Sequence, residues 1–256
     1  VYSAAAVGVV LNPANNTQLF NMAHTDDVIC VAVHPEGKYV ATGQVGARPS
    51  IVVWNAVTGE TEQILFGFHR RAVCQLDFSP DGDMLASVGQ DDDHSIAVYR
   101  WADGSCCGKT KGDQNKVLGI KFAPDSRSMV QVGVQHVKFW QLGRNMRFKK
   151  AIIGQKGVLQ NFMCAGYANS NAVVGTGDGH LYAFQGRNLD QAIKAHEQAV
   201  EAMYSYTGGL VSGSKDGKIK LWSSDLECTA EFDVAGLGTC LNARVRSVCL
   251  SADCSR

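Results

Sequence analysis

The sequence lacks a long apolar run, a basic leader and an excess of charge of either sign. Its longest apolar stretch, Ala4–Leu11, contains Gly8 and is far shorter than the roughly 18 residues that a membrane helix needs. No basic segment precedes an apolar one at the N-terminus, so the sequence predicts neither a secretory signal nor a membrane partner. The chain begins with Val1 inside what reads as a strand, and we expect it to be part of a longer protein.

The balance of charge argues against one class of partner. Lys and Arg number 24, Asp and Glu also number 24, and the formal net charge is therefore zero. Nucleic-acid-binding domains carry a basic excess, so we expect no nucleic-acid partner. Hydrophobic residues make up 45% of the chain and charged residues 19%, which is typical of a folded domain with a substantial core.

The cysteines show no pattern of a disulfide framework or of a metal site. They number nine, an odd count, and no C-x-x-C pair occurs. Cys30, Cys74, Cys164 and Cys249 stand in apolar runs, where cysteine behaves as a small hydrophobic residue. We therefore predict free thiols in a reducing compartment.

A repeated pattern decides the architecture. Each copy has three apolar runs separated by turns, and the third run ends in an aromatic residue. These aromatics are Trp54, Tyr99, Trp140, Phe184 and Trp222, at intervals of 45, 41, 44 and 38 residues. Four-stranded propeller blades repeat at about 40–45 residues. The predicted strands, copy by copy, are 28–34, 39–43 and 51–54; 73–79, 84–89 and 96–99; 117–123, 129–133 and 136–140; 159–164, 172–175 and 180–184; and 200–204, 210–213 and 218–222.

The repeat predicts an all-β fold, a WD-repeat β-propeller with five complete blades over residues 21–242. Residues 1–20 read as the last two strands of an earlier blade, at the end of a preceding hydrophobic motif. Residues 243–256 read as the start of a further blade, with its first strand at 245–252. Because propellers close on themselves, we expect a seven-bladed ring whose remaining strands lie outside this chain.

Polar residues at fixed places in the repeat predict a structural relay. His196, Ser212, Asp216 and Trp222 have the spacing of a buried hydrogen-bonded chain that locks one blade. A catalytic triad is the alternative reading, but the chain of donors and acceptors ends on a tryptophan, which is no nucleophile. The first copy has His24, Thr42 and Trp54 without the aspartate. The second has His69 and Ser87 with Asp91–Asp93, and Tyr99 is its aromatic. The third and fourth lack most of the relay, so the propeller is degenerate.

Signals for catalysis or cofactors are weak. Gly104–Thr110 resembles a phosphate-binding loop, but it is one residue short and no helix follows, so we expect a loop between outer strands. Asp91–His94 is predicted to be a solvated turn, because consecutive side chains rarely converge on one ion. His196-Glu197 lacks a second histidine four residues on, and Gly175–Gly179 reads as a hairpin turn. We predict no catalytic residue, no cofactor and no metal.

Several stretches resemble the echinoderm microtubule-associated protein-like family. The likeness begins at His24–Val28, His34-Pro35 and Ile51–Trp54, with the unusual long turn at 44–50 between them. It continues through Leu85–Gly89, Gly133–Trp140, Ile153–Gly157 and Gly208–Trp222, and Val1–Asn12 resembles the end of the hydrophobic motif that precedes that family's first propeller. The resemblance implies a tandem pair of propellers in a cytoplasmic, cytoskeletal, microtubule-associated protein. Some family members occur in cilia, so a ciliary or flagellar axoneme is implied as an alternative location.

One local charge asymmetry bears on partners. Residues 126–177 contain no Asp or Glu, whereas residues 1–100 hold eleven acidic and five basic residues. We hypothesise that a basic rim meets an acidic surface such as tubulin, the alternative being an ordinary solvated face. The candidate contact residues are Arg144, Arg147, Lys149, Lys150 and Lys156.

Three functions compete on this sequence. The resemblance favours a non-catalytic microtubule-associated protein whose partners are tubulin, axonemal proteins and a second propeller of the same chain. A general scaffold, for example in a ubiquitin-ligase or signalling complex, is the alternative, since fold alone does not name a partner. An enzyme would need acids, bases or metal ligands that converge, and the sequence shows no such set.

Overall fold

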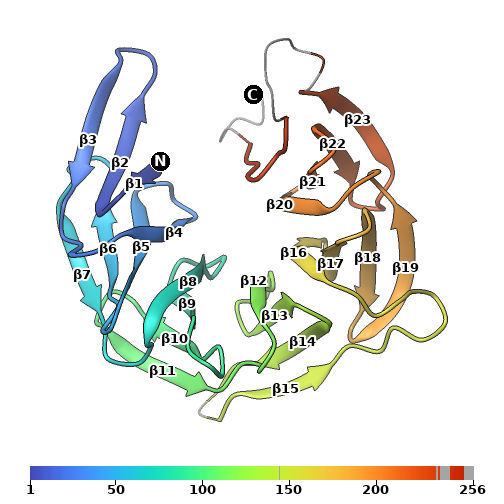
Figure 1. Ribbon diagram of the computed structural model, residues 1–256, viewed down its shortest axis with the longest axis horizontal. Coiled ribbons are helices and arrows are strands. Elements are labelled where there is room, and N and C mark those ends of the chain that lie inside the picture. Colours follow the sequence, from blue (N-terminus) through green and yellow to red (C-terminus); the bar gives the residue numbers. More distant parts are fainter. Residues whose placement is uncertain (144, 235, 237–242, 251–256) are drawn as a thin grey trace. The chain divides into compact units, whose positions relative to one another are not determined.

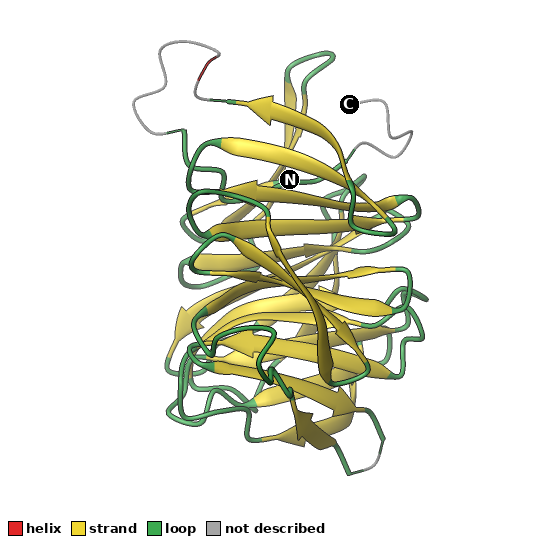
Figure 2. Ribbon diagram, turned by 90° about the vertical axis from the view of Figure 1, so that its right-hand side faces the viewer, coloured by secondary structure: helices red, strands yellow, loops and turns green. Residues whose placement is uncertain are grey.

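Strands and the loops between them make up the protein in a computed structural model, which describes residues 1–143, 145–234, 236 and 243–250 (Figures 1 and 2). No α-helix occurs among the described elements, and none of the described residues lie in a helix that could span a bilayer. The chain divides into two compact units. The first holds 1–128 and 141–147, and the second holds 129–140 and 148–256. The predicted all-β fold is confirmed.

The strands follow the predicted repeats. A leading sheet is formed by β1 (Tyr2–Ala4), β2 (Val7–Asn12) and β3 (Thr17–Asn21). The first repeat is β4 (Val28–Val33), β5 (Tyr39–Gly46), β6 (Ile51–Asn55) and β7 (Thr61–Leu65), and the second is β8 (Arg71–Phe78), β9 (Met84–Gly89), β10 (Ile96–Arg100) and β11 (Ser105–Thr110). The third comprises β12 (Val117–Phe122), β13 (Ser128–Gly133), β14 (His136–Gln141) and β15 (Arg147–Lys150). The fourth is β16 (Phe162–Ala168), β17 (Asn171–Thr176), β18 (His180–Gln185) and β19 (Asn188–Lys194), and the fifth is β20 (Val200–Tyr206), β21 (Gly209–Ser214), β22 (Lys218–Ser223) and β23 (Cys228–Asp233).

Each of the first, second, fourth and fifth repeats folds as four antiparallel strands that pair in chain order. The closing aromatic marks the same irregularity in all four. The pairing between the third and fourth strands shifts register, as at a β-bulge, at Val53/Trp54, Val98/Tyr99, Ala183/Phe184 and Leu221/Trp222. Bulges re-aim side chains, so the repeated bulge gives these four closing aromatics an equivalent setting.

Burial changes from strand to strand within a repeat. Most middle strands are buried on both faces, as in β6, because neighbouring sheets cover them, whereas β22 of the fifth repeat is half-buried. The fourth strands are exposed, as in β15 and β23. Turn chemistry joins the strands: Gly82 ends the Ser79–Gly82 turn with a φ of 82°, which a glycine adopts without strain. A side chain there would also collide with His34, whose Nε2 lies 2.4 Å from the position of a Cβ.

The structure departs from the sequence predictions in four places. The leading segment forms three strands where two were predicted, and the first strand of the fourth repeat begins at Phe162, not Leu159. Residues 105–110, predicted to be a loop, form the outer strand β11. Their sequence is polar, but antiparallel pairing with the apolar strand β10 holds them in an extended conformation. Residues 243–250 form no strand, and 251–252 lie outside the described residues.

Candidate functional site: buried relays and an exposed basic strand

The fifth repeat brings its four predicted relay residues together. Trp222 Nε1 donates to Ser212 Oγ at 2.8 Å, and Ser212 Oγ lies 2.8 Å from His196 Nε2. His196 Nδ1 lies 3.3 Å from Asp216 Oδ2, within ion-pair distance but without hydrogen-bond geometry. The Asp216 carboxylate accepts the backbone N–H groups of Glu197 and Lys218. Asp216 thus stabilises the turn through backbone hydrogen bonds and lies next to the imidazole of His196.

Burial keeps the relay histidine neutral. Desolvation lowers the pKa of His196, and the nearby Asp216 carboxylate opposes that change only in part. A neutral ring that accepts the Ser212 proton at Nε2 carries its own proton on Nδ1, facing Asp216. The chain therefore runs from indole to hydroxyl to imidazole to carboxylate. The Ser212 hydroxyl at the centre of this chain is fully buried, and the indole and the imidazole both bond to it.

The first repeat builds the same relay with an amide. His24 Nε2 lies 2.8 Å from Thr42 Oγ1, to which Trp54 Nε1 donates at 3.2 Å. Gln44 Oε1 accepts from His24 Nδ1 at 2.8 Å and from Ser50 Oγ at 2.8 Å. The glutamine takes the place of the missing aspartate, which the sequence prediction did not identify. The long turn after Gln44 supplies Ser50, so that turn completes the relay.

The second repeat inserts a hydroxyl between histidine and carboxylate. His69 Nε2 lies 2.6 Å from Ser87 Oγ and its Nδ1 lies 2.8 Å from Ser95 Oγ, which hydrogen-bonds to Asp91. Burial lowers the pKa of His69 to about 4. Burial also raises the pKa of Tyr99 to about 12, and the ring stays a neutral donor beside Ser87.

The third and fourth repeats depart further from the pattern. In the third, Trp140 Nε1 donates to Gln131 Oε1 at 2.7 Å, and the Gln131 amide lies 3.1 Å from His136 Nε2. In the fourth, the equivalent positions hold Val174 and Phe184, both buried. The signal that finds these residues is register: the relay group lies two residues beyond the residue that faces the aromatic across the sheet, as Thr42 follows Val40 and Ser212 follows Leu210.

The acidic turn of the second repeat holds three carboxylates with three different partners. Asp91 accepts the backbone N–H of Ser95 at 2.8 Å, Asp92 pairs with Arg71 at 2.7 Å, and Asp93 pairs with Lys111 at 2.9 Å. No group of three metal-ligating His, Cys, Asp or Glu residues occurs in the described part of the chain. Every cysteine that the structure describes is a free thiol.

Of the predicted partner-contact residues, three lie on the outer strand β15. Arg147, Lys149 and Lys150 are exposed there, and none has a carboxylate partner among the described residues. Lys156 lies in the connection that follows, where its Nζ donates to the Asp190 carbonyl at 2.8 Å and pairs with the Asp190 carboxylate at 3.2 Å. Arg144 lies outside the described residues. The basic strand is therefore Arg147–Lys150, and Lys156 is already neutralised.

The support beneath this strand comes from Lys138, a basic residue of the same acid-free stretch. Lys138 is buried, and its Nζ lies 4.4 Å from the ring centre of Phe148. Phe148 also packs on Trp140, the closing aromatic of the third repeat, at 4.9 Å between ring centres. The strand that carries Lys149 and Lys150 is thus anchored at Phe148 by ring and cation contacts.

Four-stranded antiparallel repeats, an aromatic at a repeated bulge and histidine relays define a propeller of the WD-repeat class. The chain belongs to the echinoderm microtubule-associated protein-like family: the family model described as the echinoderm microtubule-associated protein first beta-propeller matches residues 17–253. The resemblance that the sequence predicted is confirmed.

The relatives extend along most of the chain. The 77 kDa echinoderm microtubule-associated protein of Lytechinus variegatus is 32% identical over 244 residues, covering 89% of this chain and 37% of the relative. Echinoderm microtubule-associated protein-like 2 of Rattus norvegicus is 32% identical, covering 91% and 39%. Echinoderm microtubule-associated protein-like 4 of Homo sapiens is 29% identical, covering 91% and 27%. The chain therefore spans well under half the length of these relatives.

Proposed function

We propose that this chain is the first propeller of a non-catalytic microtubule-associated protein. The observation that carries the proposal is the match to the family's first propeller over residues 17–253, together with relatives that are themselves named microtubule-associated proteins. The chemistry of the relays is in keeping with a binding role, because their polar groups are buried and satisfy one another. The location that goes with this function is the cytoskeleton, with the ciliary axoneme as a special case, and a second propeller of the same protein is its neighbour.

We further propose that the basic strand Arg147–Lys150 contacts the acidic surface of tubulin. The exposed side chains of Arg147, Lys149 and Lys150 stand in a stretch of 52 residues, 126–177, that contains no carboxylate. Cations without local partners attract an acidic surface over about 10 Å at 0.1 M salt, and the attraction is screened as salt rises. Lys156 is a weaker candidate, because Asp190 already offsets its charge.

Co-sedimentation with microtubules tests this contact. We expect the triple change R147E, K149E and K150E in the full-length protein to abolish binding at physiological salt. The matched control changes R48E, R187E and K215E, which alter the net charge equally at exposed sites elsewhere. We expect the control to bind like the unaltered protein. If the triple variant binds as tightly as the unaltered protein, the basic-strand contact is wrong. If both the triple variant and the control lose binding, the effect is one of net charge alone, which also contradicts the contact.

A further inference from the structure

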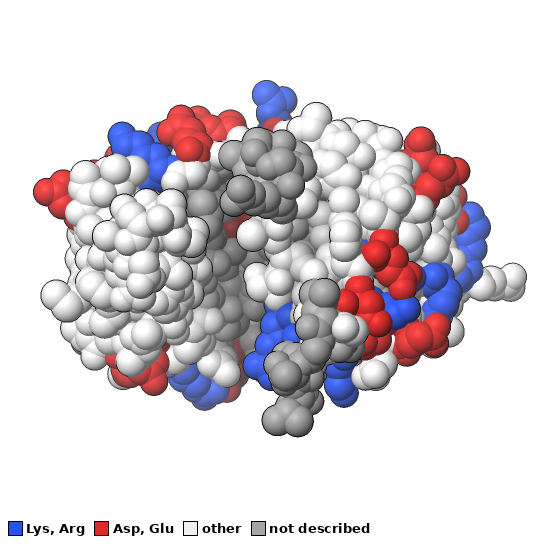
Figure 3. Space-filling view, turned by 90° about the horizontal axis from the view of Figure 1, so that it is seen from above, with Lys and Arg blue, Asp and Glu red and all other residues white. Residues whose placement is uncertain are grey.

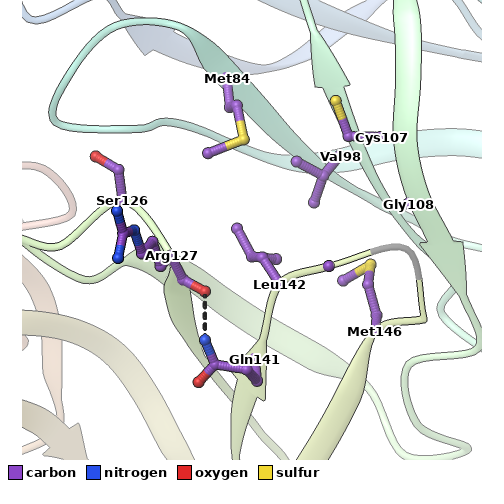
Figure 4. A pocket seen from close by; sticks show the side chains of 10 residues that line it. Met84, Val98, Cys107, Gly108, Ser126, Arg127, Gln141, Leu142 and Met146 are labelled. Carbon is purple, nitrogen blue, oxygen red and sulfur yellow. Dashed lines mark hydrogen bonds between the residues drawn. The ribbon is translucent and has the colours of Figure 1, made fainter.

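A cavity in the first unit has no role in the relays or in the basic strand. It has a volume of about 470 Å³ and mostly apolar walls (Figure 4). Met84 and Val98 of the second repeat form one side, and Leu142 and Met146 form another. Cavities of about 300–1,000 Å³ with apolar walls and a few polar groups are the usual form of a ligand site. Methionine side chains adapt their shape, which suits an apolar group of variable form.

The guanidinium of Arg127 marks the rim of this cavity. Arg127 lies across the cavity from Met146 and Cys107 and beside Ser126 (Figure 4). Its backbone is held in place, since its carbonyl accepts from the Leu142 N–H at 2.9 Å and from the Gln141 amide at 3.2 Å. Its side chain is exposed and has no carboxylate partner among the described residues.

Two acidic residues close to Arg127 are already engaged: Asp125, two residues before it, and Asp81, whose backbone N–H donates to Ser126 Oγ. The Asp125 carboxylate accepts the N–H groups of Arg127 and Ser128 at 2.8 and 3.1 Å. The Asp81 carboxylate accepts from Ser79 Oγ and from the Asp83 N–H. These bonds cap local turns and leave the guanidinium of Arg127 available. An arginine fork binds a carboxylate through two parallel hydrogen bonds.

We propose that this cavity binds a short acidic peptide segment of a partner protein, with an apolar side chain between Met84 and Met146 and a neighbouring carboxylate on Arg127. Charge complementarity selects this occupant, because the exposed guanidinium of Arg127 has no carboxylate partner among the described residues. A basic or neutral apolar segment leaves that guanidinium unsatisfied. The inference goes beyond microtubule association, since it assigns a separate peptide site to residues outside Lys149 and Lys150.

Fluorescence polarisation with a defined probe tests the site. The probe is a fluorescein-labelled ten-residue peptide with two acidic residues on each side of a central Leu-Phe pair. We expect saturable binding to the full-length protein, at least tenfold weakening by R127Q, and at least tenfold weakening by M146E, which places a carboxylate in the cavity. The control R48Q removes an exposed arginine elsewhere, and we expect it to change affinity less than twofold.

Matched peptides separate the two halves of the recognition. Replacing Leu-Phe by Ser-Ser keeps the charge, and replacing the acidic residues by glutamines keeps the apolar pair; we expect each to bind at least tenfold more weakly. Absence of saturable probe binding would overturn the proposal. So would binding that K149E/K150E abolishes while R127Q and M146E leave it intact, because the peptide would then lie on the basic strand.

Discussion

The relay side chains show how single residues hold one sheet of this protein together. In each relay the histidine is buried, with Nε2 facing a hydroxyl or amide and Nδ1 facing an oxygen acceptor. The acceptor differs: a carboxylate in the fifth repeat, the Gln44 amide in the first, the Ser95 hydroxyl in the second and the Val134 carbonyl in the third. The geometry depends on the pattern of donors and acceptors and tolerates several residue types. We propose that these relays serve the fold.

Removing the central hydroxyl of the fifth relay is expected to destabilise the protein. In Ser212→Ala both His196 Nε2 and the Trp222 N–H lose their partner in a buried setting, which costs about 2 kcal/mol. Urea denaturation followed by tryptophan fluorescence measures the loss. The control is Ser170→Ala, at an exposed turn residue. A free energy of unfolding for Ser212→Ala within about 0.5 kcal/mol of the control would contradict the structural role.

The neutral histidines predict a dependence of stability on pH. His24, His69 and His196 each have a pKa below the ordinary value of 6.5 because they are buried. Between pH 6.5 and the pKa of the folded state, the unfolded chain therefore binds more protons than the folded chain. The free energy of unfolding is thus highest, as far as these histidines are concerned, above pH 6.5, and it falls as pH drops below that value. For His69 alone, the fall to about pH 4 amounts to roughly 3 kcal/mol.

Urea midpoints at pH 7.5, 6 and 5 check this expectation. The carboxylates of Asp91, Asp178 and Asp216 have lowered pKa values, so their contribution is lost only below about pH 4. Burial raises the pKa of Asp77, which opposes the effect of the three histidines as pH falls. We expect the midpoint to fall steadily from pH 6 to pH 5. A midpoint that stays constant or rises over that interval would show that the relay histidines are protonated in the folded protein.

At the scale of elements, close contacts between neighbouring sheets fix the fourth and fifth repeats. A Cβ at Gly175 of β17 would lie 2.6 Å from Cys164 Sγ and 2.9 Å from the Val200 side chain. Cys164 also donates to the Val200 carbonyl, at 3.3 Å, and burial raises the pKa of its thiol to about 12. The first repeat has the equivalent contact, formed by Gly43, Cys30 and Val73. A glycine at this place in the second strand lets the next sheet pack closely.

Gly175→Ala is therefore expected to lower the free energy of unfolding by about 1–3 kcal/mol through overpacking. Gly177→Ala is the matched control two residues away, since a Cβ there meets only atoms at 3.5 Å or beyond. Thermal unfolding of both variants gives the comparison. If Gly175→Ala melts at the same temperature as Gly177→Ala, the close contact with Val200 does not constrain the sheets.

Sequence reasoning predicted the inner elements better than the outer ones. Buried strands such as β6 and β9 have apolar runs bounded by turn residues, and their limits were predicted to within a residue. The outer strands β11 and β15 read SCCGKT and RFKK, and only pairing with an inner strand makes them strands. The relay members Gln44, Ser95 and Gln131 were missed because an amide or a second hydroxyl replaces the expected aspartate or serine. Their identity depends on register.

At the scale of the whole molecule, both ends of the chain bear on the predicted ring. Residues 1–25 contain no charged residue, and Figure 3 shows the corresponding uncharged area over β2 and β3 on its left side. Phe20 of β3 and Met22, which follows that strand, are exposed. At the other end, Val245 packs 2.5 Å from the position of a Cβ at Gly213, as Val200 packs against Gly175. We propose that 245–250, the described part of the predicted strand 245–252, becomes the inner strand of a further blade in the longer protein.

Hydrogen exchange in the full-length protein tests the continuation of the fold. Val245 N already donates to the Ser214 carbonyl at 3.0 Å, and we expect a partner strand from the following sequence to protect the amides of 246–250. Exchange at least a hundredfold slower than in an unstructured peptide is the expected result. Unprotected amides throughout 246–250 would contradict the further blade and leave the five repeats and the leading sheet as the observed extent.

We propose that this propeller belongs to a protein that binds microtubules through its basic outer strand. Electron cryomicroscopy of microtubules incubated with the full-length protein at low salt tests this contact. We expect density for this propeller on the microtubule surface, with the strand Arg147–Lys150 facing tubulin. Bare microtubules, or density in which that strand faces solvent, would contradict it.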